Sequence, residues 1–326
     1  MIITQTPLRI SFFGGGTDFR DYYMRKGGGA VLSTAIDKYI FAIIKERFDE
    51  RIYINYSRKE IVDEVGAIEH ELVREGMRKA GIEKGVEITT LADIPSEGSG
   101  LGSSSSVTVG LLNLFYLYQA KSLSAGKLAG DACHIEIDIL KKPIGKQDQY
   151  AAAFGNLNII RFNPDDSVNV EPLVVDERIW HALEANLMLI YTGMSRSSDE
   201  ILSEQKENIR ERTRVLSRMR DMVYEGRECL LKGRLDDFGR LLGKGWELKK
   251  SLADGITNPQ IEKIYEGALK AAALGGKVCG AGGRGFLLLY CPFEQQNKVR
   301  DALGGPRELS FHFERDGTKA IFNIRR

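Results

Sequence analysis

The sequence predicts an α+β protein with two domains, and three observations lead to this class. Its 326 residues exceed the length at which a single hydrophobic core usually stops growing. Strand-like and helix-like stretches are mixed along the chain without an internal repeat. Apolar residues make up 43% and charged residues 28%, the balance of an ordinary globular protein. We place the boundary at Asn163–Pro164, where two aspartates follow and the pattern breaks, which gives domains of 1–163 and 164–326.

Apolar periodicity predicts the elements of the first domain. β-branched and aromatic residues favour strands at Ile36–Phe48 and Arg51–Tyr56, which we expect to form a hairpin turning at Asp49–Glu50. Apolar residues at helical spacing predict an amphipathic helix over Ala67–Lys79, and Gly81 is a typical stop. The other expected elements are strands at Val86–Thr90 and Asn156–Arg161 and helices at Val107–Gln119 and Lys127–Leu140.

The second domain is expected to be richer in helices. A densely charged stretch with apolar residues at helical spacing predicts one long helix over Asp199–Leu231, whose charges we interpret as a solvated face. Two more helices are expected at Arg234–Leu252 and Pro259–Leu274. Short apolar runs predict strands at Leu187–Tyr191 and Phe286–Cys291.

Composition and charge argue against several kinds of partner. The chain has 46 basic and 45 acidic residues, a net charge of +1, which gives no long-range field for gathering nucleic acid or an anionic membrane. Arg9 interrupts the apolar run near the N-terminus, and no stretch approaches the ~20 apolar residues that span a bilayer. The four cysteines match no zinc spacing and are expected to be reduced thiols. We therefore expect a cytoplasmic protein without nucleic-acid or membrane partners.

The stretch from Pro95 to Ser106, PSEGSGLGSSSS, carries the strongest indication of function. Its glycines allow backbone conformations and close approaches that side chains forbid, and an uncharged apolar stretch that predicts a buried helix follows the serines. The free N–H groups and positive dipole end of a helix N-terminus bind anions, and a serine hydroxyl can bind Mg²⁺. The stretch lacks Gly-Lys-Ser/Thr and so is not a Walker A motif. We interpret it as a cradle for nucleotide phosphates and not as a flexible linker, because the segment after it is buried in character.

A second glycine-rich stretch, Gly14–Asp18, follows Pro7-Leu8-Arg9 near the N-terminus. An early strand is expected to end here in a glycine turn that carries a carboxylate. Asp18 offers acceptors for sugar hydroxyls, and Arg9 is a permanent cation that suits a phosphate or a neighbouring carboxylate. On this motif alone, a tight turn with a surface salt bridge is about as good an interpretation.

Two acidic residues are candidates for phosphoryl-transfer chemistry. Asp148, between two glutamines in Gly145–Gly155, suits the group that orients or deprotonates the attacking hydroxyl. Glu136, in the preceding expected helix, suits a ligand for Mg²⁺. Taken alone, each acid is more often structural or exposed.

The stretch Cys279–Phe286, CGAGGRGF, contains Gly-x-Gly-x-x-Gly. In a dinucleotide-binding protein that motif follows a strand and opens a helix, whereas here a helix comes first and a strand follows. We therefore interpret it as a turn that brings the backbone close to a ligand or another loop, and not as a dehydrogenase fingerprint.

These stretches, in this order, resemble the motifs of the GHMP family of small-molecule kinases over nearly the whole chain. PLRISFFGGGTD is similar to the first motif, PSEGSGLGSSSS to the second and CGAGGRGF to the third, and GKQDQ is similar to the stretch with the catalytic aspartate in the family's sugar kinases. Within the family the likeness is strongest to kinases of D-glycero-D-manno-heptose 7-phosphate, through FFGGGTDFRDYY, DKYIFAII, LIYTGMSRSSDEIL and GKVCGAGGRGFLLLY.

The resemblance implies a fold, ATP with Mg²⁺, and a set of site residues. The fold is an N-terminal domain like domain 2 of ribosomal protein S5, followed by a ferredoxin-like C-terminal domain. Asp148 would be the base or orienting anion, with Arg9 beside the transferred phosphoryl group. Ser104 and Glu136 would ligate the metal, although the serine run itself does not choose among its members. The implied phosphate-binding residues are Pro95, Gly98, Ser99, Gly100, Leu101, Gly102, Ser103, Ser104 and Ser105, and the implied substrate-binding residues are Gly15, Gly16, Thr17, Asp18, Gly282, Gly283 and Arg284.

Arg284 is a departure, since we expect glycine at that position of the third motif. It either points outward or contacts a phosphate. The residues that compete with it for a phosphate already on the substrate are Arg20, Arg25, Lys26, Lys146 and Arg196.

The reaction that the resemblance implies is phosphorylation of C1 of D-glycero-D-manno-heptose 7-phosphate to the 1,7-bisphosphate, a precursor of nucleotide-activated heptose. The alternatives are an anomeric kinase of a fucose- or galactose-type sugar, and a non-catalytic regulator that binds sugar and ATP. A homodimer is the candidate assembly.

Overall fold

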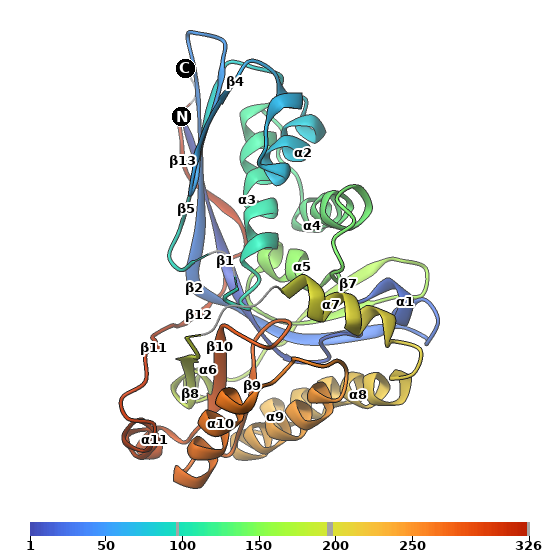
Figure 1. The fold of residues 1–326 in the computed structure, drawn as a ribbon, viewed down its shortest axis with the longest axis vertical. Helices are drawn as coiled ribbons and strands as arrows, with labels where there is room; N and C mark the ends of the chain where they lie inside the picture. The colour runs from blue at the N-terminus through green and yellow to red at the C-terminus, as the bar shows by residue number, and fades with distance from the viewer. Residues whose placement is uncertain (96–97, 194–197, 325–326) are drawn as a thin grey trace.

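The computed structural model describes residues 1–95, 98–193 and 198–324 and contains two β-sheets with helices packed against them (Figure 1). The larger sheet runs along the long axis of the molecule, and the smaller sheet lies toward the bottom of the view among the helices of the C-terminal half. The two termini lie side by side because the last strand pairs with the first. This arrangement confirms the α+β class.

The larger sheet is organised around β2 (Gly29–Glu46), an 18-residue strand. The N-terminal half of β2 pairs with β6 (Leu157–Phe162) and the C-terminal half with β5 (Val86–Ala92), while β1 (Ile2–Phe13) runs antiparallel along most of its length. The strand order is β13-β1-β2-β5-β3-β4, with β6 and β12 joined to β2 and with β7 joined to β6. The remaining strands are β3 (Ile52–Asn55), β4 (Lys59–Val62), β7 (Val168–Pro172), β12 (Phe313–Glu314) and β13 (Lys319–Asn323).

The hairpin expected at Asp49–Glu50 is wrong, although strands are present on both sides of it. β3 pairs in parallel with β5, which lies between β2 and β3. Gly85, just before β5, accepts a hydrogen bond from Arg47 N and donates one to Glu50 O, at 2.8 and 2.9 Å. The end of β2 and the start of β3 are therefore both tied to the chain that enters β5. Alternating burial marks β3 as a strand but does not choose its partner.

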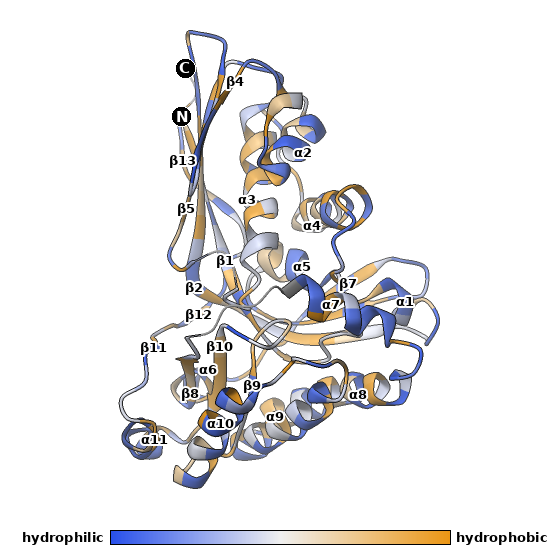
Figure 2. Ribbon diagram, viewed as in Figure 1, coloured by the Kyte–Doolittle hydropathy of each residue, from blue (hydrophilic) through white to orange (hydrophobic). Residues whose placement is uncertain are grey.

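Four helices cover one face of the larger sheet, namely α2 (Glu71–Ala80), α3 (Ser103–Tyr118), α4 (Ala125–Cys133) and α5 (Gln147–Phe154) (Figure 1). The central one, α3, packs against β1 and β2 and is buried on most sides, and Figure 2 shows hydrophobic residues along it. Gly81 ends α2 in the left-handed conformation (φ 78°), as expected. The helix expected over Lys127–Leu140 is α4 followed by a π-helical turn, His134–Ile139.

The smaller sheet is antiparallel, in the order β11-β8-β10-β9, and both strands expected in this half belong to it. Its strands are β8 (Leu187–Tyr191), β9 (Gly275–Val278), β10 (Phe286–Tyr290) and β11 (Glu308–Leu309). The remaining helices are α1 (Arg20–Tyr23), α6 (Glu177–Ala185), α7 (Ser198–Glu207), α8 (Thr213–Leu231), α9 (Leu235–Lys250), α10 (Pro259–Ala271) and α11 (Gln296–Ala302), with 3₁₀ turns at Val65–Ala67 and Phe293–Gln295.

The single helix expected over Asp199–Leu231 is wrong, since α7 and α8 are separate helices. The break at residues 208–212 contains neither glycine nor proline and begins at Asn208. Asn208 Nδ2 donates to Leu252 O at 3.1 Å, and Ile209 is buried. We infer that these contacts with the rest of the chain end α7.

The two halves of the chain share strands and packing. β12 and β13 return to the larger sheet, and one core cluster joins Tyr23 and Phe162 to Met188 and Ile190 of β8. The boundary expected at Asn163–Pro164 falls in the turn between β6 and β7 and stays a prediction. The four cysteines are buried free thiols. Within the described ranges, no helix is both long and apolar enough to cross a membrane.

Candidate active site

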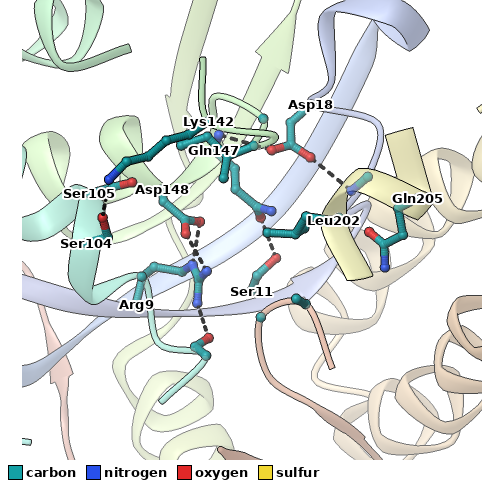
Figure 3. A pocket seen from close by; sticks show the side chains of 18 of the residues that line it. Arg9, Ser11, Asp18, Ser104, Ser105, Lys142, Gln147, Asp148, Leu202 and Gln205 are labelled. Atoms are coloured by element: carbon teal, nitrogen blue, oxygen red, sulfur yellow. Dashed lines mark hydrogen bonds and ion pairs between the residues drawn. The ribbon is translucent and has the colours of Figure 1, made fainter. Parts of the chain in front are cut away.

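A cavity of about 590 Å³ lies where the N-terminal end of α3 meets the β9–β10 loop, and all four sequence motifs reach it (Figure 3). The expected site residues that line it are Arg9, Gly15, Gly16, Asp18, Gly98, Ser99, Gly100, Gly102, Ser103, Ser104, Ser105, Asp148 and Arg284. Segments that are far apart in the sequence are therefore brought into one site.

The glycine–serine loop, residues 98–106, leads into α3. Gly98, Gly100 and Gly102 all adopt positive φ, between 75° and 79°, which side chains rarely allow. Gly102 precedes the helix, and no side chain of the described residues caps its N-terminus. The first N–H groups of a helix have no partner within it, and the serines at this end line the cavity. The loop therefore presents donors and a positive dipole end, which suit phosphate.

The β9–β10 loop, residues 279–285, packs backbone to backbone against the glycine–serine loop. A Cβ on Gly100 would lie 2.5 Å from Cys279 O, and a Cβ on Gly280 would lie 2.6 Å from Gly100 Cα. A Cβ on Gly285 would similarly lie 2.4 Å from Ser99 O. This confirms the expectation that CGAGGRGF is a turn for close backbone approach, and it shows that another loop is what the turn approaches.

Arg9 and Asp148 form a bidentate ion pair in the cavity (Figure 3). Arg9 Nε and Nη2 donate to Asp148 Oδ1 and Oδ2 at 2.7 and 2.6 Å, and Nη1 donates to Gly100 O at 2.6 Å. Arg9, on β1, is 3% exposed, whereas the Asp148 side chain, in the first turn of α5, is 24% exposed. The planar fork of the guanidinium fixes the orientation of the carboxylate. Asp148 is thus held in place while remaining accessible from the cavity.

Asp18 is a second, deeply buried carboxylate in the cavity, 3% exposed. Its Oδ1 accepts from Gly16 N at 2.9 Å and its Oδ2 from Gln147 N at 3.3 Å. Glycine is required at position 145, because a Cβ there would lie 2.0 Å from Asp18 Oδ2. Burial, together with repulsion by Asp148, raises the pKa of Asp18 to about 6. The group is therefore poised to change charge near neutral pH.

Ser104 and Glu136 lie close enough to share a metal ion. Ser104 Oγ donates to Glu136 Oε1 at 3.2 Å, and Gln149 Nε2 donates to Oε2 at 2.6 Å. Glu136 belongs to the π-helical turn, and burial raises the pKa of its carboxyl group. Over the described residues, no group of three or more His, Cys, Asp and Glu side chains could hold a metal. Two oxygen donors beside the glycine–serine loop fit Mg²⁺, which commonly takes one or two protein ligands and completes its shell with phosphate oxygens and water.

Two buried lysines reach the cavity from the C-terminal half of the chain. Lys277 Nζ on β9 donates to Ser11 O and Phe12 O, at 2.7 and 3.1 Å. Lys249 Nζ on α9 donates to the carbonyls of Val278, at 3.1 Å, and Gly280. Burial lowers the pKa of both, to about 8 for Lys277. Lys277 therefore connects β9 to β1, and Lys249 connects α9 to β9 and the β9–β10 loop, at this wall of the cavity.

Some residues of the expected site lie outside the cavity wall, namely Thr17, Pro95, Leu101, Glu136, Gly282 and Gly283. Thr17 Oγ1 donates to the carbonyls of Gly14 and Ala30, so it shapes the glycine turn. Gly283 N donates to Ile256 O at 2.7 Å, which joins the β9–β10 loop to the segment after α9. The roles expected for these residues stay predictions.

The basic candidates for a substrate phosphate lie in different surroundings. Arg284 lines the cavity beside Gly98. Arg20 and Lys146 are both paired with Asp166. Of the others, Arg25 lines a separate cavity, Lys26 is exposed, and Arg196 lies outside the described residues.

Sequence reasoning missed several residues of the cavity wall. Ser11 Oγ donates to Gln147 Oε1 at 2.8 Å, and its position two residues after Arg9 on a strand was a usable indication that it shares that face. Lys142 Nζ lies 3.5 Å from Ser104 Oγ. The wall also includes Leu202, Gln205, Met219, Lys249, Leu252 and Lys277. For these six, no local pattern separates a cavity residue from its neighbours, because the folded chain alone brings them to the site.

The glycine–serine loop at the N-terminus of α3 suits the phosphates of a nucleoside triphosphate, and the fixed Asp148 in the same cavity suits the hydroxyl that would accept a phosphoryl group. Residues 65–156 match the GHMP kinases N terminal domain and residues 227–306 match the GHMP kinases C terminal domain. The chain is 30% identical over 98% of its own length and 98% of the relative's to D-glycero-alpha-D-manno-heptose 7-phosphate kinase of Campylobacter jejuni. The chain belongs to the GHMP kinase family, whose members are ATP-dependent phosphotransferases.

Two further relatives are similar over most of this chain. The crystal structure of a D-glycero-D-manno-heptose 1-phosphate kinase from Bacteroides thetaiotaomicron superimposes with a TM-score of 0.83 and 28% identity over 100% of both chains. The L-fucokinase/L-fucose-1-P guanylyltransferase of Bacteroides fragilis is 26% identical over 87% of this chain, which corresponds to 34% of that protein. The expected fold, with its N- and C-terminal GHMP kinase domains, is thereby confirmed.

Proposed function

We propose that this kinase transfers the γ-phosphoryl group of ATP to the anomeric C1 hydroxyl of D-glycero-D-manno-heptose 7-phosphate. The observation that carries the proposal is the bidentate pair between Arg9 and Asp148, which fixes a carboxylate at the cavity next to the glycine–serine loop. A phosphoryl acceptor must meet such a carboxylate and the γ-phosphate at the same time. The product would be heptose 1,7-bisphosphate, which suits a following step of heptose activation by a nucleotide.

Asp148 would accept a hydrogen bond from the C1 hydroxyl and take its proton as the oxygen attacks the γ-phosphorus. The bond between that phosphorus and the bridging oxygen to the β-phosphate would break, and ADP would leave with the bonding electrons. Arg9 touches both Asp148 and Gly100 O, so it links the acceptor's carboxylate to the phosphate-binding backbone. Its charge would also stabilise the transferred group.

Ser104 Oγ and Glu136 Oε1 would hold Mg²⁺, which when bound neutralises charge on the phosphate oxygens. The N–H groups at the head of α3 would bind the remaining phosphate oxygens. Asp18 would accept hydrogen bonds from hydroxyls of the sugar, since an ionised carboxylate offers acceptors only.

The names of the relatives support a heptose but place its existing phosphate at different carbons, C7 in the one from Campylobacter jejuni and C1 in the one from Bacteroides thetaiotaomicron. The test is release of ADP from Mg-ATP with a panel of acceptors. The panel contains heptose 7-phosphate, heptose 1-phosphate, unphosphorylated heptose, fucose, galactose and mevalonate. We expect the highest kcat/KM with heptose 7-phosphate, and ³¹P NMR of the product should show a new anomeric phosphate.

Other outcomes of the panel have defined meanings. If the enzyme phosphorylates fucose or galactose but not heptose 7-phosphate, the proposed substrate is refuted, while the assignment as a sugar kinase stands. Binding of ATP and sugar without ADP release would favour the non-catalytic regulator.

A further inference from the structure

The helix α7 supplies one wall of the cavity. Asp199, Leu202 and Gln205 line it at three-residue spacing and so lie along one face of the helix. Figure 3 shows Leu202 and Gln205 on this helix, on the side of the cavity where Asp18 lies. Met219 of α8 and Leu252 add apolar surface to the wall. The stretch LIYTGMSRSSDEIL reaches this wall at Asp199 and Leu202, but no motif gave a site role to these residues or to Gln205.

Gln205 has an incomplete set of contacts. The residue is 8% exposed, and its Nε2 has no hydrogen-bond partner among the described residues. Buried polar side chains are nearly always satisfied by protein, water or a ligand, because an unpaired buried donor is costly. An amide of this kind at the wall of the cavity suits water or a ligand hydroxyl as its partner.

We infer that Gln205 is a specificity-determining residue that donates a hydrogen bond from Nε2 to a hydroxyl oxygen of the acceptor sugar. The inference rests on the proposed function, since it requires a polyhydroxylated acceptor. A hydroxyl that donates to Asp18 keeps lone pairs that can accept, and Asp18 has no donor when ionised. Gln205 supplies that donor, while Leu202, Met219 and Leu252 suit the apolar C–H faces of a sugar ring.

Such a contact selects substrates by the presence of one hydroxyl. A site that hydrogen-bonds a substrate hydroxyl rejects the analogue without it, because the polar group of the protein is then left unpaired. Removing the amide of Gln205 and removing the hydroxyl that it binds should therefore each raise KM for the sugar, and the two changes together should raise it little more than either alone. Loss of packing on α7 would instead affect every analogue alike.

The experiment compares wild type and Gln205→Leu on heptose 7-phosphate and on its 2-, 3-, 4- and 6-deoxy analogues. For the parent sugar, Gln205→Leu should raise KM about tenfold, with a smaller change in kcat and none in KM for ATP. For the analogue that lacks the hydroxyl bound by Gln205, the wild-type KM should already be higher than for the parent sugar. Gln205→Leu should raise the KM for that analogue by less than about twofold. The control is Glu200→Leu, which alters an exposed residue of α7 that does not line the cavity; its kinetics should match wild type.

Two results would overturn the inference while leaving the proposed function intact. One is an active Gln205→Leu enzyme with wild-type KM for the parent sugar. The other is an equal loss on every analogue. If Gln205→Leu does not fold, Gln205→Glu keeps the size and replaces the donor by an acceptor, and it must show the same selective loss. If wild type accepts another sugar, the deoxy series is built on that sugar, and if it accepts none, both proposals fall together.

Discussion

At the residue scale, the contact between Arg9 and Asp148 is the one on which the proposed chemistry depends. Asp148→Asn should lower kcat by roughly 10²–10⁴-fold, the range for losing a general acid–base group, with smaller changes in KM. The amide keeps the shape but cannot take the proton. Because Arg9 would lose its charged partner in a buried site, the variant should also be less stable, so its fold must be checked by ATP binding. The control is Asp63→Asn, an exposed residue of an ion pair outside the cavity. Wild-type kcat in Asp148→Asn would refute the assignment.

The pKa of Asp18 leads to a second prediction at this scale. Since its pKa is raised to about 6, Asp18 loses its negative charge as the pH falls through that value, and it then binds sugar hydroxyls with one acceptor fewer. For the sugar, kcat/KM should fall below about pH 6, because that ratio reports groups of the free enzyme.

Phosphates on both substrates also titrate near this pH, so Asp18→Asn is the necessary comparison. The variant should have a lower kcat/KM at neutral pH and a shallower acid limb than wild type. A ratio of the two profiles that does not change between pH 5 and pH 7, a window of about one unit on each side of the expected pKa, would contradict the prediction.

At the element scale, the approach between the glycine–serine loop and the β9–β10 loop can be tested with a matched pair of glycines. Gly280 and Gly304 have similar positive φ, 65° and 72°, but Gly304 has open space where a Cβ would be. Gly304→Ala should cost about 1 kcal/mol in the free energy of unfolding, from the backbone conformation alone. Gly280→Ala should cost roughly 1–3 kcal/mol more, from overpacking against Gly100, and should raise KM for ATP. Equal effects of the two substitutions on unfolding and on KM would show that the contact is unimportant.

Some ends and pairings of the helices and strands could be predicted from the sequence, and others could not. The glycine–serine loop before α3 and the end of α2 were predictable because each depends on glycines and neighbours within a few residues, although α3 begins at Ser103 and not at the expected Val107. The partner of β3 was not, since alternation defines a strand without defining what pairs with it. The break between α7 and α8 was not either, because it depends on Asn208 reaching Leu252 and Ile209 reaching the core.

The site residues also divide into those that local sequence predicts and those that only the folded chain brings together. Gly98 to Ser105 and Asp148 stand in local patterns that carry chemistry by themselves. Lys249 follows a tryptophan, a glutamate and a leucine in a charged helix, and nothing local separates a lysine that will be buried from one that will be solvated. Gln205 is ordinary in sequence and becomes informative only in the folded chain, where its Nε2 is buried and finds no partner in the part of the chain that the structure describes.

At the scale of the whole molecule, Lys277 joins the two sheets, because it belongs to β9 of the smaller sheet and donates to two carbonyls of β1 in the larger one. Its pKa is lowered from 10.5 to about 8. Between these two values the unfolded chain binds a proton at this lysine that the folded chain does not. Stability therefore rises with pH across the window as far as this group contributes.

Lys277→Met should be less stable than wild type, and the deficit in the free energy of unfolding should widen as the pH rises from about 8 to 10.5, by at most roughly 1.4 kcal/mol per pH unit. Urea unfolding of both proteins across this window measures the difference, from which the tyrosines largely cancel because both proteins contain them. Lys298→Met, an exposed lysine on α11, should show no widening. A deficit for Lys277→Met that stays constant or narrows with pH would mean that the lysine joining the sheets remains charged throughout.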